Sequence, residues 1–263
     1  MRKALFLLMT ELSSRKWISR LAGKIAKASF SRRWIGTFVR LYGIDPLEAE
    51  KAVDEYASLN EFFTRRLAPG ARPIDEHPEA LVSPVDARIA GMGKIRDGLL
   101  INVKGQDYTV EELLNRSPRA VNYRGGFFFV LYLSPADYHR IHSPVAGKLV
   151  ESEHIPGTVY PVHDFGMRHM RKILSRNERL VTYIRHELGE IAVVKIGAMN
   201  VNGIRYADGL SDRLERGGEL AMFEFGSTVV LLTQTGTFEP REGLAEGHKV
   251  RMGERLGLLR KEL

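Results

Sequence analysis

The 263-residue sequence contains no cysteine, which excludes disulfides, thiolate metal ligands and a cysteine nucleophile. It also lacks the Gly-x-Ser-x-Gly, Gly-x-Gly-x-x-Gly and P-loop motifs, and this disfavours an α/β-hydrolase, a dinucleotide-binding domain and an NTPase. The apolar run at residues 4–9 is far shorter than the roughly 20 residues that span a bilayer. With 44% hydrophobic and 27% charged residues, the composition is that of an ordinary globular protein.

Acidic side chains are nearly missing from the first 43 residues, where Glu11 is the single acid beside ten basic residues. This segment carries a net charge of +9, so the rest of the chain sums to −2 within a total of +7. The sequence therefore predicts a basic arm, residues 1–43, and a near-neutral body, residues 44–263. The basic residues of the arm are Arg2, Lys3, Arg15, Lys16, Arg20, Lys24, Lys27, Arg32, Arg33 and Arg40.

The basic arm is also amphipathic. Apolar residues recur at helical spacing from Trp17 to Ala26 and again from Trp34 to Tyr42, and Lys and Arg lie off both stripes. This pattern is typical of helices that lie in the interface of an anionic membrane. We therefore expect a peripheral protein on the cytoplasmic face of the cell membrane.

A basic, amphipathic arm is open to three other interpretations. A signal peptide is disfavoured because Thr10 and Glu11 follow the apolar run at once and no small-x-small cleavage site follows closely. Nucleic-acid binding is disfavoured because the body is not basic and carries no nucleic-acid motif. Packing of both apolar stripes against the body stays open.

The body has the texture of a β-rich α+β domain with antiparallel sheets. Residues 45–67 are predicted to be helical, after which Pro69, Gly70, Pro73 and Pro78 break the chain. Beyond Leu81, short runs rich in Val, Ile, Phe and Tyr alternate with Gly and Pro, which predicts strands. The clearest predicted strands are residues 127–133, 191–196 and 228–233, and helical pieces are expected at residues 110–114 and 167–174.

A short repeat marks the body. Ser83-Pro84-Val85 begins a segment that recurs sixty residues later as Ser143-Pro144-Val145, and a Ser-Pro turn that enters a strand explains the form. The pattern resembles the strand turns of biotinyl and lipoyl carrier domains, which implies a barrel-sandwich-like core. The Met-Lys-Met tripeptide that biotinyl domains commonly carry is absent, so we interpret the repeat as architecture.

Four residues stand out on chemical grounds. Asp86 follows the first Ser-Pro turn, His139 and His142 come just before the second, and Ser227 follows Gly226 at the start of an apolar run. A glycine before a serine leaves the backbone room for attack, and Asp, His and Ser can form a charge-oriented nucleophile. Structural roles stay open: Asp86 as a turn cap, Ser227 as a turn residue, and the histidines as polar strand-end residues. No further ligands with suitable spacing accompany the histidines, so no metal is expected.

Ten segments in a fixed order, spread over residues 59–232 and so over most of the chain, carry a resemblance. They are Asn60-Glu61-Phe62-Phe63, Arg72-Pro73-Ile74-Asp75, Val82-Ser83-Pro84-Val85-Asp86, Lys104-Gly105 with Tyr108, Tyr132-Leu133-Ser134-Pro135, Asp137-Tyr138-His139-Arg140-Ile141-His142, Asn177-Glu178-Arg179, Ile196-Gly197-Ala198, Gly203-Ile204 and Gly226-Ser227-Thr228. The ordered set resembles the bacterial, membrane-associated, pyruvoyl-dependent phosphatidylserine decarboxylase family. Ala87 and Phe225 stand where that family often has glycine and leucine, and neither change removes a reactive group.

The resemblance implies a chain that cuts itself between Gly226 and Ser227, giving a β chain, residues 1–226, and an α chain, residues 227–263. Ser227 Oγ would attack the preceding carbonyl to form an ester. Elimination of the ester and hydrolysis would release ammonia and leave a covalent pyruvoyl group, the cofactor, in place of Ser227. His142 would act as the base, oriented by Asp86.

The resemblance also implies the reaction. The pyruvoyl ketone would form a Schiff base with the amine of phosphatidylserine and accept electrons as CO₂ leaves, giving phosphatidylethanolamine. His139 would serve in substrate binding and proton transfer during decarboxylation. The expected partners are phosphatidylserine, an anionic membrane surface and the two chains of one precursor, without nucleic acid; a homodimer is left open.

Three alternative functions remain at this point. The first is a serine hydrolase that uses Ser227, His142 and Asp86 without self-cleavage. The second is a decarboxylase of another aminoacyl lipid or of a free amino acid. The third is not an enzyme but a membrane-bound, carrier-like β module built on the Ser-Pro-Val repeat.

Overall fold

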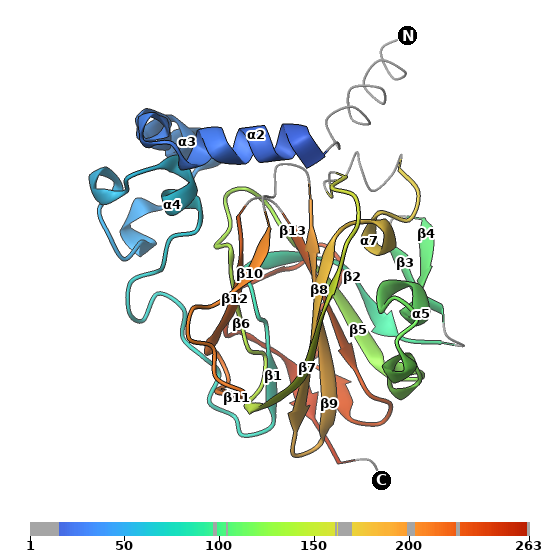
Figure 1. Ribbon diagram of the computed structural model, residues 1–263. Coiled ribbons are helices and arrows are strands. Elements are labelled where there is room, and N and C mark those ends of the chain that lie inside the picture. Colours follow the sequence, from blue (N-terminus) through green and yellow to red (C-terminus); the bar gives the residue numbers. More distant parts are fainter. Residues whose placement is uncertain are drawn as a thin grey trace.

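The protein is an α+β structure in which helices lie across one end of a β-rich body (Figure 1). This is the predicted fold class. The computed structural model describes residues 16–96, 99–103, 105–160, 162, 170–198, 203–224 and 227–261.

The N-terminal part is helical. It consists of α2 (Lys16–Lys27), the 3-10 helix η1 (Ser29–Trp34), α3 (Ile35–Tyr42), the 3-10 turns η2 (Pro46–Glu48) and η3 (Val53–Glu55), and α4 (Leu59–Phe63). Helices are found over both predicted amphipathic stripes. Residues 1–15 of the arm lie outside the described residues.

The prediction of helix throughout residues 45–67 is wrong, because the segment is divided by caps and extended residues. Asp45 Oδ1 accepts a hydrogen bond from Leu47 N and starts one turn, and Ser58 Oγ accepts from Glu61 N and starts α4. The two ends of the segment also pair with each other, since Glu50 N donates to Arg66 O at 3.0 Å. Such pairing cannot form within a single helix.

An eight-stranded antiparallel sheet forms the centre of the body, in the order β11-β7-β8-β9-β13-β5-β2-β15. Its strands are β11 (Arg213–Leu214), β7 (Gly147–Ile155), β8 (Arg179–His186), β9 (Gly189–Gly197), β13 (Ser227–Thr233), β5 (Phe127–Leu133), β2 (Ala87–Lys94) and β15 (Lys249–Val250). All three predicted strands are confirmed, as β5, β9 and β13. They are central strands buried on both faces, which explains their continuous apolar runs.

Smaller elements cover the two faces of this sheet. One core lies against β1 (Ala80–Val82), β16 (Arg255–Leu259) and β14 (Phe238–Pro240), and against the sheet β10 (Ile204–Tyr206), β12 (Glu219–Phe223) and β6 (Arg140–His142). The other core lies under the hairpin β3 (Leu99–Val103) and β4 (Gln106–Thr109), with α5 (Val110–Leu113), η4 (Pro118–Tyr123) and α7 (Ile173–Arg176). The helical piece expected at 110–114 is α5. The one expected at 167–174 is found from Ile173 onward, and residues 167–169 lie outside the described residues.

The Ser-Pro-Val repeat forms two equivalent turns that pair with each other. Ser83 Oγ donates to Val85 O and Ser143 Oγ donates to Val145 O, each at 2.7 Å. The turns are joined reciprocally: Val82 N donates to Pro144 O, and His142 N donates to Pro84 O. The pairing places the residue before one turn beside the other turn, and so brings the chain around Asp86 next to His142.

Candidate active site

Ser227 is the first residue of β13 and is fully buried. It pairs with Leu133 of β5 on one side and Gly197 of β9 on the other. Its side chain faces the core that contains Val229 and Leu231. Among the described residues Ser227 Oγ has no hydrogen-bond partner, although leaving a buried polar group unpaired costs about 1–3 kcal/mol. Gly226, on the other side of the expected cleavage point, lies outside the described residues.

His139 is a buried, neutral histidine in the loop after β5. Its Nδ1 lies 2.8 Å from Asp137 O, and because a carbonyl only accepts, Nδ1 carries the proton. Burial lowers the pKa of His139 to about 3, and its ring lies 4.0 Å from that of Phe63, centroid to centroid. Nε2, the unprotonated nitrogen, has no partner within the described part of the chain. His139 Nε2 therefore carries an unshared lone pair, and burial makes it a weak base.

His142 ends β6 and is nearly buried, and both of its ring nitrogens are engaged. Nδ1 donates to Gly217 O at 2.8 Å, and Nε2 lies 3.0 Å from the hydroxyl of Tyr138. Burial is the main cause that lowers the pKa of His142. The imidazole is therefore neutral, with Nε2 as the basic nitrogen.

The carboxylate of Asp86 is held by a guanidinium and a backbone amide. Arg72 reaches both carboxylate oxygens, with Nη2 at 2.6 Å from Oδ2, and Met252 N donates to Oδ1 at 2.8 Å. Arg72 also pairs with Glu48 at 2.7 Å. These charge-assisted contacts hold the Asp86 side chain fixed in place.

Strand register brings Asp86 and Ser227 to the same end of the large sheet. Arg88 of β2 and Thr228 of β13 pair with the same residue, Tyr132 of β5, so Asp86 and Ser227 lie just beyond corresponding positions on either side of β5. His139 is joined to the strand that leads toward Ser227. Its carbonyl accepts a hydrogen bond at 3.0 Å from the amide of Phe223, which lies four residues before Ser227.

The hydrogen bonds of an Asp–His–Ser triad are not formed among the described residues. Asp86 is bound to Arg72 rather than to His142, and His142 is bound to Tyr138 rather than to Ser227. The triad stays a prediction. Sequence reasoning missed Arg72 and Tyr138 as site residues: both stand in the motif segments, but nothing in the pattern shows which side chains they contact.

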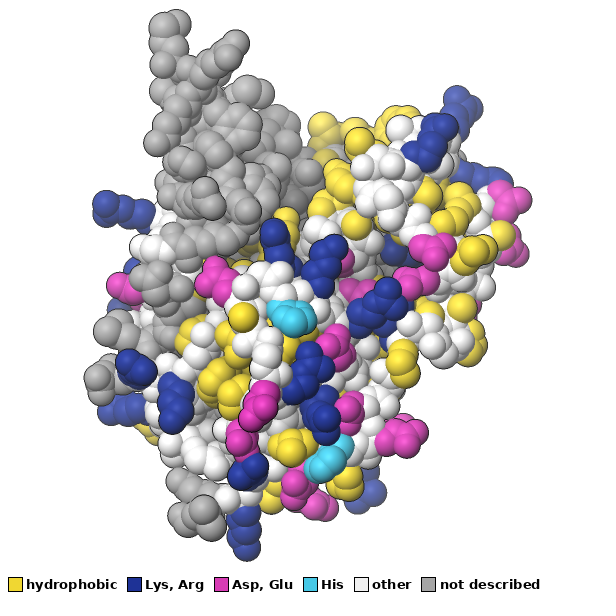
Figure 2. All heavy atoms as spheres, turned by 180° about the vertical axis from the view of Figure 1, so that it is seen from behind, with side chains coloured by type: hydrophobic (Ala, Val, Ile, Leu, Met, Phe, Trp, Pro, Cys, Tyr) yellow, Lys and Arg dark blue, Asp and Glu magenta, His cyan; other side chains and the backbone are white. Residues whose placement is uncertain are grey.

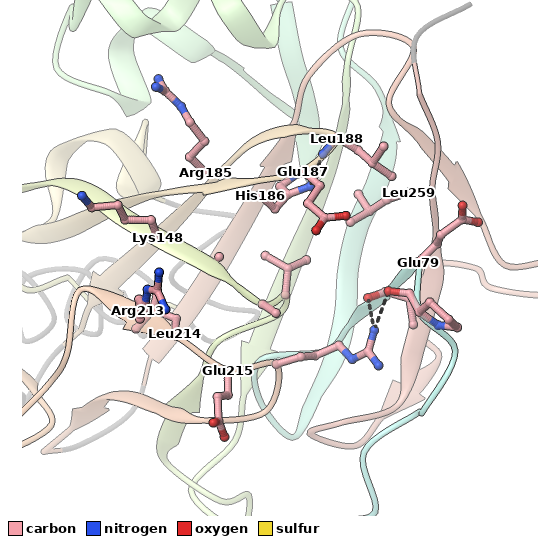
Figure 3. Close-up of a pocket in the computed structure, with 16 residues that line it drawn as sticks. Glu79, Lys148, Arg185, His186, Glu187, Leu188, Arg213, Leu214, Glu215 and Leu259 are labelled. Carbon is pink, nitrogen blue, oxygen red and sulfur yellow. Dashed lines mark hydrogen bonds between the residues drawn. The ribbon is translucent and has the colours of Figure 1, made fainter.

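Two hollows bear on where a substrate could enter. One, of about 220 Å³, opens beside His142 and is also lined by Arg66, Arg72 and Tyr138. A larger one, of about 1020 Å³, lies at the β8–β9 turn and is lined by Arg185, His186 and Glu187 together with the segment around Arg213 and Glu215 (Figure 3). Ser227 pairs with the opposite end of β9, so the larger hollow is remote from the candidate residues.

Neutral histidines and a buried serine are side chains that the acid–base site of an enzyme can use. Comparison with known families defines it further, because residues 59–258 match the family model described as phosphatidylserine decarboxylase. The chain belongs to this family and is a decarboxylase. The resemblance stated from the ordered motifs is thereby confirmed.

Curated relatives match the chain over nearly its whole length. It is 42% identical over 258 residues to the phosphatidylserine decarboxylase proenzyme of Brevibacillus brevis, covering 91% of this chain and 92% of the relative. The proenzyme of Geobacillus kaustophilus is 41% identical, with 98% and 97% covered. That of Halalkalibacterium halodurans is 42% identical, with 98% of each chain covered.

Proposed function

We propose that this chain is a proenzyme that cuts itself between Gly226 and Ser227 and then converts phosphatidylserine into phosphatidylethanolamine and CO₂. The observation that carries the proposal is Ser227 itself, a buried hydroxyl at a strand start with no partner among the described residues. All three relatives compared above are named proenzymes.

The position of Ser227 fits a pyruvoyl group. A pyruvoyl group supplies a ketone that takes up the substrate amine and draws off electrons when CO₂ leaves. A new N-terminus at this point would place an ammonium in a fully buried position, which is unfavourable without a partner. The pyruvoyl group is uncharged, and its formation removes the unpartnered hydroxyl. Gly197 opposite Ser227 adds no side chain there.

The two histidines have different tasks in this proposal. For self-cleavage, His142 Nε2 takes the Ser227 Oγ proton as Oγ attacks the carbonyl of Gly226, which requires the Tyr138 hydroxyl to give way. The C–N bond breaks, the proton passes to the amine, and an ester remains. Asp86 favours the protonated form of His142 through its charge. His139 Nε2 is free to hold or move a proton at the substrate.

The arm provides a surface for the membrane. Leu21, Phe30, Trp34 and Leu41 are between 46% and 72% exposed, while Lys24, Arg33 and Arg40 are exposed beside them. Bulky apolar and basic side chains together suit insertion into an anionic interface. No helix within the described residues is long and apolar enough to cross a membrane.

The arm packs against the body as well as exposing these side chains. Ala26 and Ile35 are buried, and Ile35 packs in a small core with Tyr56 and Phe62. On the face in Figure 2, basic and acidic side chains are interspersed. The proposal is a lipid surface, because exposed bulky apolar side chains accompany the basic ones on the arm.

The intact mass of the denatured protein, measured beside Ser227→Ala, tests the proposed function. We expect two chains divided at 226/227, the smaller one lighter by one ammonia than a peptide that begins with serine, and a single Ser227→Ala chain. The wild type should convert phosphatidylserine in vesicles to phosphatidylethanolamine. Active protein that consists of one uncut chain would contradict the proposal and favour the serine hydrolase.

Vesicle flotation tests the lipid surface. Leu41→Asp, at a side chain 72% exposed on the arm, should reduce binding to phosphatidylserine vesicles. Val121→Asp, at a side chain 65% exposed on η4, is the matched control and should leave binding unchanged. Equal binding by both variants and the wild type would show that the arm does not hold the membrane.

A further inference from the structure

An ion pair joins the arm to the chain just ahead of Ser227. Lys27 Nζ lies 2.8 Å from both carboxylate oxygens of Glu224, across 197 positions of sequence. Lys27 is the last residue of α2, and Glu224 directly follows β12, three positions before Ser227. The pair therefore links a helix of the arm to the segment that enters the proposed cleavage site.

Glu224 is the buried member of this pair. The Glu224 side chain is 11% exposed, whereas the Lys27 side chain is 42% exposed. Within the described part of the chain, Lys27 is the side-chain partner of this carboxylate. A buried carboxylate is strongly disfavoured when its partner is removed, so the position of Glu224 depends on the position of Lys27.

The end of α2 is itself fixed to the body. Ser31, which is fully buried, donates from Oγ to Ala26 O at 2.8 Å and accepts from Leu59 N at 2.9 Å. Leu59 begins α4, and at the end of α4 the ring of Phe63 lies against His139. The arm thus contacts both the element that supports His139 and the segment that leads to Ser227.

We propose that Lys27 is a positioning residue for self-cleavage: by holding Glu224, its ammonium fixes the backbone that enters Ser227. The inference rests on the proposed cleavage at 226/227. Attack by Ser227 Oγ on the preceding carbonyl requires close and oriented atoms, and a displacement of about 1 Å at such a centre can cost about 100-fold in rate. Glu224 lies three positions before Ser227, so we infer that the ion pair acts on that geometry.

The test is the rate at which the 37-residue α chain appears from full-length proenzyme made by cell-free translation. Lys27→Ala should slow its appearance by about 10- to 100-fold, because Glu224 loses its partner. Lys27→Arg should stay within a few-fold of wild type. The exchange variant Lys27→Glu/Glu224→Lys should recover most of the rate lost in Lys27→Ala. Melting temperatures in a Ser227→Ala background show whether each variant folds.

Lys172→Ala is the matched control. Lys172 pairs with Glu112 at 2.7 Å and its side chain is 40% exposed, close to the value for Lys27, but the pair lies near α5 and α7. This variant should cleave at the wild-type rate.

The outcomes separate the two proposals. A wild-type chain that never divides at 226/227 contradicts the proposed function, and the role of Lys27 fails with it. If the wild type divides and Lys27→Ala divides equally fast, only the role of Lys27 is wrong. If Lys27→Ala is slow and neither Lys27→Arg nor the exchange variant recovers the rate, the ion pair is not the cause and the inference is overturned.

Discussion

The two Ser-Pro-Val turns have the same backbone and different chemistry. Each serine bonds to the carbonyl two residues on, and each turn is joined to the other through a proline carbonyl. At equivalent positions, however, the first turn carries Asp86 and the second carries Ala146. The residue that enters the second turn is His142, where Val82 enters the first. Each copy thus supplies one reactive group that the other lacks.

The difference shows that the hydrogen bonds shared by the two turns maintain the fold and do not supply the chemistry. The partners of the turns are equivalent too: Gly253 N donates to Ser83 O at 2.9 Å, and Gly217 N donates to Ser143 O at 2.8 Å. In each pair of equivalent positions, Asp86 with Ala146 and His142 with Val82, only one residue has a reactive side chain. Substitutions at equivalent positions should therefore have unequal effects on self-cleavage and more similar effects on stability.

The largest expected effect is at Asp86. Asp86→Asn removes one of the two carboxylates that Arg72 binds, and it removes the charge that favours protonated His142. We expect self-cleavage to fall by about 100-fold or more, measured as the rate of α-chain formation. Ala146→Asn, at the exposed equivalent position, is the control and should cleave normally. Equal rates for the two variants would remove Asp86 from the mechanism.

His142→Val makes the second turn resemble the first, and should reduce cleavage by about 100-fold through loss of the base. The pH dependence of protein stability gives a second measurement of the role of His142. Burial lowers the folded-state pKa of His142 below 6.5, so the unfolded state binds the proton first as pH falls. The Ser227→Ala protein should therefore lose stability as pH falls through 6.5, by a smaller amount when His142→Val is added. Melting temperatures at pH 7.5 and 5.5 measure this, and identical slopes would contradict it.

The smallest effects concern the two glycines, and here both turns should respond. Gly217 and Gly253 have φ values of +78° and +85°, so alanine is strained at each, by about 1–3 kcal/mol of unfolding free energy. A Cβ at Gly253 would meet the backbone oxygen of Pro73 at 2.6 Å, whereas at Gly217 the nearest atom is Cδ1 of Ile74. Gly253→Ala should be the more destabilising in chemical denaturation of the Ser227→Ala protein. The reverse order would show that the side chain of Ile74 cannot move aside.

The strands and helices that could be predicted from the sequence are those with a clear local pattern of apolar residues. Continuous apolar runs marked β5, β9 and β13 because these central strands are buried on both faces. Periodic apolar residues likewise marked the helices of the arm. The helix expected over residues 45–67 was wrong because caps at Asp45 and Ser58 outweigh its composition.

The site could be predicted only in part. Ordered motifs pointed to Asp86, His139, His142 and Ser227, but their contacts depend on packing between distant segments. The amide that binds Asp86 belongs to Met252, 166 positions away, and the carbonyl that binds His142 belongs to Gly217, 75 positions away. Both partners are backbone groups, which every residue type has, so no residue pattern predicts either contact.

The place of β13 in the sheet has a consequence for the mature enzyme. β13 pairs along its full length with β5 on one side and β9 on the other, and β16 lies between β1 and β14. A cut before Ser227 would leave two polypeptides whose strands pair within the same sheet and share one core. They would share a single unfolding transition, and separating them would require denaturation. Maturation would then be a one-way event in the life of each molecule, since a chain that begins without an amino group cannot be rejoined.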